Sequence, residues 1–187
     1  MAVEFGKIKD DFIELEAFVL NDLEIITNST KGGNYAAALL ITAACEALGT
    51  LRYGRKDGGQ EFFENYLLPE PWRAVSKSIY DALRNGLAHS FSTKAVVNAS
   101  EKPIELGVSW SKEKHLSYDS GCSVLFLNIQ QLANDLRSAF DRYQSELQQR
   151  PELRDTFYRW REKQRIYQVQ NKNEKGKWNA LLKQTAT

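Results

Sequence analysis

Two side chains with distinctive chemistry lie close together in the segment RNGLAH, residues 84–89. Histidine exchanges protons near neutral pH, and His89 is one of only two histidines in the chain. Arginine keeps its charge and presents a planar fork of N–H donors suited to phosphate oxygens, and Arg84 precedes His89 by five positions. These residue types could combine proton transfer with stabilisation of negative charge, provided that the fold brings them together.

An α-helix does not bring Arg84 and His89 together by itself. At 3.6 residues per turn, positions five apart point roughly 140° away from each other. Asn85 and His89 are four apart and share a face, so Asn85 could fix the orientation of the imidazole ring. Two arrangements would let Arg84 and His89 share a site. Gly86 and a helix end near Ser90 could bend the geometry, or a second copy of the helix could approach across a two-fold axis.

Helical periodicity places this motif inside a mainly helical chain. Apolar residues recur at helical spacing in segments that predict helices at about 6–28, 34–53, 60–67, 71–91, 129–149 and 151–170. The segment 34–53 is apolar nearly all round, as a central helix is, and Glu46 is its only acid. Asn34 and Asn128 stand where they could cap the helices that follow them. The motif therefore falls near the end of the fourth predicted helix.

Between residues 93 and 127 the pattern changes to short β-prone runs separated by turn residues. The runs are 95–97, 104–110, 115–118 and 123–127, and they predict a small antiparallel meander of two to four strands. We therefore expect a mainly α fold, a bundle of four to six helices, into which this meander is inserted. Residues 171–187 are expected to be partly without regular structure.

Composition limits the class of protein. The chain has 187 residues, 42% of them hydrophobic and 26% charged, which suits one globular domain with a full core. Its two cysteines lack the spacing of a disulfide framework or a zinc site, and the first residues lack the apolar core of a signal peptide. Motifs of P-loops, dinucleotide-binding folds and serine hydrolases are absent. No apolar run approaches the roughly 18 residues of a membrane span. We expect a cytoplasmic protein that uses no membrane, metal or cofactor.

In this setting RNGLAH resembles the Arg-x4-His motif of the HEPN superfamily, in which a polar residue such as Asn often follows the Arg. Two long helices, a motif helix and a further helix also stand in the order that the superfamily shows. The resemblance covers about residues 8–149, so we expect a HEPN-like helical domain at 1–149 with the β insertion at 93–127. Residues 150–187 would form a basic, aromatic C-terminal helix and tail that packs on this domain or extends from it.

The resemblance implies a metal-independent endoribonuclease of the kind found in toxin–antitoxin and other defence systems, a homodimer through the motif helix. His89 would perform acid/base chemistry, Arg84 would bind phosphate, and Asn85 would orient His89 or the substrate. The expected products are a 2′,3′-cyclic phosphate and a 5′-hydroxyl. The implied partners are RNA and a cognate antitoxin or nucleotidyltransferase. Some such toxins are neutralised by AMP transfer to a Tyr two residues after the His, a position that holds Phe91 here.

Other interpretations of the motif stay open. The protein could be a non-enzymatic HEPN-like module that binds a nucleotide, nucleic acid or a partner protein, or a scaffold with no site. Arg84 and His89 could serve only the helix end, since basic side chains there satisfy free carbonyl groups and the helix dipole. Glu46 and Ser90 are candidate supporting residues of the site, although the preferred interpretation of Glu46 is that it simply stands at the edge of its helix.

The C-terminal segment is basic. Residues 150–187 hold ten Lys or Arg against four Asp or Glu, a net charge of +6 in a chain whose total is +1. Basic and aromatic side chains are interleaved there, a pattern that can hold single-stranded RNA by phosphate contact and stacking. The candidate contacts are Arg154, Arg159, Trp160, Arg161 and Arg165. The preferred alternative is that Leu153, Phe157, Trp160 and Tyr167 pack on the bundle. His115 and the turn at Arg55 and Lys56 are expected to be exposed.

Overall fold

The computed structural model describes residues 3–29, 32–90, 92–97, 101–110, 115–164 and 171–185. Its helices are α1 (Phe5–Thr27), α2 (Asn34–Tyr53), α3 (Gly59–Phe62), α4 (Ser76–Ser90), α5 (Ile129–Gln149), α6 (Pro151–Gln164) and α7 (Lys172–Thr185). A π-helical turn at Phe63–Leu67 and a 3₁₀ turn at Trp72–Val75 join α3 to α4. The short strands β1 (Val96–Val97), β2 (Pro103–Ser109), β3 (Ser117–Asp119) and β4 (Val124–Asn128) lie between α4 and α5. The mainly helical fold and the position of the β segment are confirmed.

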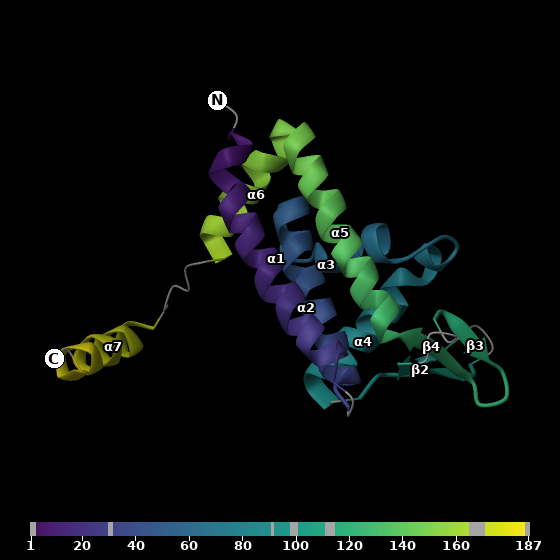
Figure 1. Cartoon of the computed structure of the whole chain (residues 1–187). Coiled ribbons are helices and arrows are strands. Elements are labelled where there is room, and N and C mark those ends of the chain that lie inside the picture. Colours follow the sequence, from purple (N-terminus) through teal and green to yellow (C-terminus); the bar gives the residue numbers. More distant parts are fainter. Residues whose placement is uncertain are drawn as a thin grey trace.

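Helix α2 is the centre of the bundle. It packs against α1, α3, α4, α5 and α6, and Figure 1 shows α1 and α5 running along it as long neighbouring helices. Its 20 residues contain an 18-residue stretch with a mean hydropathy of 1.3, long and apolar enough to cross a membrane, but 56% of that stretch is buried inside the structure. Burial by surrounding helices is typical of the core helix of a soluble protein, which agrees with the predicted central role of this segment.

An aromatic cluster fastens α6 to the bundle. Phe12 of α1 meets Phe140 and Tyr143 of α5 edge-on, with ring centroids 5.8 and 5.9 Å apart, and lies 6.1 Å from Phe157 of α6. Phe157 is fully buried, so the predicted packing of the C-terminal helix on the bundle is confirmed for α6. The expectation for the tail was wrong in part, since Lys172–Thr185 form α7, which stands apart from the bundle in Figure 1.

The sheet is mixed, so the prediction of an antiparallel meander was wrong. Its strand order is β1-β2-β4-β3: β2 and β4 pair in parallel, whereas β1–β2 and β3–β4 are antiparallel. The physical reason is burial. The apolar strand β4 buries Leu125 and Leu127 and takes an inner position, while the short polar β3 stays at the edge. Gly107 of β2 pairs with Phe126, and its missing side chain leaves room for that ring.

The two predicted helix caps had different outcomes. Asn128 caps α5, because its Oδ1 accepts a hydrogen bond from the backbone N–H of Gln131 at 2.7 Å. Asn34 does not cap α2, since it is already the first residue of that helix and Gly33 precedes it as the cap. The Asn34 side chain instead donates to the carbonyl of Val108 at 3.3 Å and so ties α2 to the sheet.

Candidate functional site

Helix α4 presents the RNGLAH segment with one face fixed in the core. Leu83 and Leu87 are buried, and so is Gly86 between them. A Cβ at Gly86 would lie 2.3 Å from the carbonyl oxygen of Ser92 and 2.9 Å from the backbone nitrogen of Lys94. Residues 92–94 therefore run directly against the helix, an approach that glycine alone permits. This packing leaves Arg84 and Asn85 partly exposed and His89 at the open end of the helix.

Arg84 is held from two sides. Its Nε–H donates to Glu46 Oε1 on α2, and Nη1 donates to Asn85 Oδ1 at 3.0 Å. The hydrogen bond to Glu46 is the main cause that raises the pKa of Arg84, while burial acts in the opposite direction. The two side chains are 39% and 40% exposed, so water screens their attraction and the pair mainly sets geometry. The candidate contact between Glu46 and Arg84 is present, against the preferred interpretation that Glu46 simply stands at the helix edge, and Asn85 turns to Arg84 rather than to His89.

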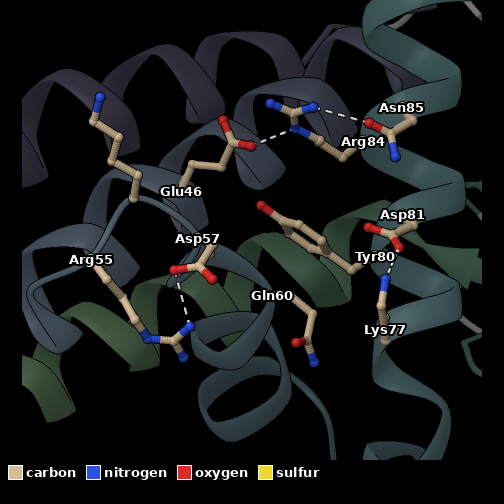
Figure 2. A pocket seen from close by; sticks show the side chains of 11 residues that line it. Glu46, Arg55, Asp57, Gln60, Lys77, Tyr80, Asp81, Arg84 and Asn85 are labelled. Atoms are coloured by element: carbon tan, nitrogen blue, oxygen red, sulfur yellow. Dashed lines mark hydrogen bonds and ion pairs between the residues drawn. The ribbon is translucent and has the colours of Figure 1, made fainter.

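A polar pocket of about 460 Å³ opens beside Arg84, between α2, α4 and the turn that leads into α3. Figure 2 shows Tyr80 and Gln60 within it and the ion-paired side chains around it. The lining residues are the cations Arg55, Lys56, Lys77 and Arg84, the acids Glu46, Asp57 and Asp81, and Gly59, Gln60, Tyr80 and Asn85. Such a set of N–H donors with a small excess of positive charge suits an anionic group such as phosphate.

Close glycine contacts position the far wall of this pocket. A Cβ at Gly59 would lie 2.5 Å from the Tyr80 hydroxyl and 2.8 Å from the Cα of Glu46. A Cβ at Gly49 of α2 would lie 2.2 Å from the carbonyl oxygen of Gly58. These glycines let the 54–59 turn press against α2 and α4, which brings the exposed Arg55 and Lys56 to the pocket rim. Sequence reasoning missed these two residues, and the only available signal was the glycine pair beside them.

His89 lies outside the pocket and is exposed, as is Ser90 at the end of α4. The helix stays regular through Ser90, so the bend that would turn His89 toward Arg84 within one chain is not present. Within the described ranges no hydrogen bond joins Asn85 to His89, and the Asn85 oxygen accepts from Arg84 instead. Ser90 does not line the pocket beside Arg84 either. Phe91 lies outside the described residues.

Some of the residues predicted to contact RNA from the C-terminal helix are engaged within the fold, and others are accessible. Arg154 donates to the carbonyl oxygens of Val3, Leu147 and Gln148, so its guanidinium fastens α6 to its neighbours. Arg161 is 17% exposed and lies 3.9 Å from Glu14 of α1. Arg159 is exposed, and Trp160 is half-buried beside Lys163. Arg165 and Tyr167 lie outside the described residues. Of these residues, Arg159 and Trp160 therefore remain accessible for a ligand.

The second histidine is not exposed as predicted. The His115 side chain is 17% exposed, accepts a hydrogen bond at Nδ1 from the Asn128 backbone N–H at 3.3 Å, and has Nε2 3.9 Å from Asp135. Burial is the main cause that lowers the pKa of His115. Cys45 is buried, which raises the pKa of its thiol and makes it a poor nucleophile. Across the described part of the chain, no cluster of three or more His, Cys, Asp or Glu is placed to hold a metal ion.

Comparison of the chain with protein-family models, with curated proteins and with solved structures gave no match. The function therefore has to be inferred from the residues of the site and their geometry.

Proposed function

We propose that this protein is a HEPN-like, metal-independent endoribonuclease that acts as a homodimer through α4. One observation carries the proposal: Arg84 is held by Glu46 and Asn85 at a cationic pocket, and His89 stands exposed further along the same helix. One short segment thus contains a side chain that can bind phosphate and a side chain that can transfer a proton, in the pattern that the HEPN superfamily shows.

The chemistry assigned to each residue follows from its donors. Arginine has five N–H donors, and Glu46 and Asn85 engage only two of those of Arg84, so further donors can meet phosphate oxygens. In the proposed step, the 2′-oxygen of RNA forms a bond to phosphorus and the bond from phosphorus to the 5′-oxygen breaks. His89 accepts the proton of the 2′-hydroxyl, and the leaving 5′-oxygen takes a proton from water. Arg84 stabilises the charge on the pentacoordinate phosphorus.

The requirement for two chains follows from the direction of the side chains. Arg84 faces α2 and the pocket, whereas His89 is exposed at the helix end and does not line it. A second α4 related by a two-fold axis would supply His89 to the Arg84 of its partner, and each chain would do the same for the other. The exposed face of α4 carries Lys77, Ser78, Ala88 and His89. The short side chains of Ser78 and Ala88 would allow the α4 of a second chain to approach closely.

The test is cleavage of single-stranded RNA by the purified protein with and without a chelator, with mapping of the product ends. Arg84→Ala and His89→Ala should each abolish cleavage, and Ser145→Ala, an exposed position on α5 outside the pocket and the α4 face, serves as the control. If the site combines two chains, mixing the two inactive variants should restore roughly a quarter of the wild-type activity, because half of the dimers are mixed and hold one complete site. Cleavage that survives His89→Ala, or that requires a divalent metal, would overturn the proposal.

The biological setting is part of the same proposal. A toxin–antitoxin or defence role in the cytoplasm, with a cognate antitoxin or nucleotidyltransferase as partner, predicts that expression arrests growth and that a neighbouring gene relieves the arrest. Phe91 in place of Tyr makes AMP transfer at that position an unsuitable route of neutralisation. Growth that is unaffected by wild-type protein, compared with His89→Ala, would remove this part of the proposal.

A second candidate function has its own supporting observation. The pocket beside Arg84 has four cations on its wall, but His89 is outside it, an arrangement that fits a module that binds a nucleotide without cleaving it. In that case AMP should bind to the wild type, and Arg84→Ala should abolish the binding. His89→Ala should leave AMP binding unchanged, and RNA should stay intact with the wild type as well as with the variant. Calorimetry with AMP, run beside the cleavage assay, distinguishes the two functions.

A further inference from the structure

A second cavity, of about 670 Å³, lies between α2 and α6 next to the Arg84 pocket. It is lined by Ala43, Glu46, Ala47, Thr50, Lys56, Trp160, Lys163 and Gln164. Glu46 and Lys56 line both cavities, so the two adjoin along α2. A ligand of sufficient length can therefore occupy both while it stays on the same face of the protein.

The second cavity differs in character from the first. Ala43, Ala47 and Thr50 follow each other at helical spacing on one face of α2, and their small side chains leave space beside the Trp160 indole. Trp160 also packs closely on Gly54, where an added Cβ would lie 3.2 Å from the indole nitrogen. A flat aromatic group could therefore lie against the small side chains of α2 and stack on the Trp160 indole.

Cations border this apolar surface. The Lys163 ammonium lies 4.4 Å from the centre of the Trp160 ring. Lys56 stands at the junction with the first pocket, and no ion pair engages it within the described residues, whereas Arg55, Lys77 and Arg84 each have an acidic partner. The junction therefore offers a cation that is ready to meet a phosphate between two nucleosides.

We infer that this cavity accepts an unpaired nucleobase of a single-stranded RNA, stacked on Trp160, while the adjoining phosphate lies at Lys56 and the next at Arg84. The inference rests on the proposed function and names a second substrate contact for it. It has two consequences: an oligonucleotide binds more tightly than a mononucleotide, and a single strand binds more tightly than a duplex, whose bases are already stacked.

The experiment measures fluorescence anisotropy with a labelled 12-nucleotide 2′-O-methyl RNA, which lacks the attacking hydroxyl and is not cleaved, and with the same strand in a duplex. Trp160→Ala should weaken binding of the single strand about tenfold, and Trp160→Phe should restore most of it. Lys56→Ala should lower the slope of log affinity against log salt by about one. Trp178→Ala changes an exposed tryptophan of α7 and should have no effect. Circular dichroism checks that each variant is folded.

The outcomes separate this inference from the proposed function. Binding that needs Arg84 but is unchanged in folded Trp160→Phe, Trp160→Ala and Lys56→Ala variants would overturn the second contact and leave the ribonuclease proposal intact. Duplex binding as tight as that of the single strand would also overturn it. RNA cleavage abolished by His89→Ala, together with a tenfold loss of binding in Trp160→Ala, supports both. Absence of any binding by the wild type overturns both.

Discussion

Gly86→Ala should destabilise the protein although alanine is the better helix former. In an open helical position the change would favour folding by about 1 kcal/mol. At position 86 the new Cβ would stand 2.3 Å from the Ser92 carbonyl oxygen, so residues 92–94 have to move. That movement strains the hydrogen bond from the Lys94 N–H to the Ala82 carbonyl, which is 3.2 Å long. Overpacking costs about 1–3 kcal/mol and a lost hydrogen bond about 1 kcal/mol, so we expect a net loss of about 1–3 kcal/mol.

Urea denaturation followed by circular dichroism measures this loss directly. For a chain of this length the same loss should lower the melting temperature by roughly 2–12 °C. Gly6→Ala on α1 is the matched control, because nothing lies within 4 Å of the added Cβ, and it should stabilise the protein by up to about 1 kcal/mol. A Gly86→Ala protein as stable as the wild type would refute the close approach of residues 92–94 to α4.

Three further changes test the pocket, the hydrogen bonds around Tyr66 and the half-buried His115. Glu46→Gln removes an acid that lines the pocket, so phosphate affinity measured by calorimetry should rise about two- to fivefold, and a fall would contradict the charge argument. Tyr66→Phe removes the hydroxyl that joins Arg52 to Glu146, and should lower the free energy of unfolding in urea by about 1–2 kcal/mol. RNA cleavage should not change, since Tyr66 does not line the pocket. Burial lowers the pKa of His115, so the unfolded state binds more protons below pH 6.5, and stability should fall as pH decreases from 7 to 5. His115→Gln should reduce this slope, and an unchanged slope would exclude His115 as its source.

The helices were predictable because their burial follows the 3.6-residue period. The segment 34–53 was apolar on nearly every side, and it became α2, Asn34–Tyr53, with neighbours all around it. The order of the strands was not predictable in the same way. Alternation identifies a strand and its buried face, but it does not say which partner lies at each edge. Only the burial of Leu125 and Leu127 in the folded chain places β4 beside β2.

The site was predictable only in part. The sequence favoured a place at the helix edge for Glu46, the only acid of α2, but its contact with Arg84 could at least be named as a candidate. The role of the turn at Arg55 and Lys56 could not, because it depends on backbone contact between glycines that lie apart in the chain. His115 was mispredicted because its environment is supplied by Asn128 at the end of β4 and by Asp135 of α5, beside which the antiparallel pairing of β3 with β4 places it.

The separation of Arg84 and His89 on α4 makes the proposed activity depend on protein concentration. Each chain holds the whole of the pocket beside Arg84, the proposed phosphate site, so RNA binding per chain should stay constant on dilution. Cleavage requires His89 from a second chain, so the activity per chain should fall as the dimer dissociates, in step with the monomer fraction measured by light scattering. The same dilution series on the Trp160→Ala variant should show weaker binding but the same concentration of half-maximal activity per chain, because Trp160 lies on α6, away from the exposed face of α4. Activity per chain that stays constant through dissociation would mean that one chain suffices, and the two-chain site would have to be abandoned.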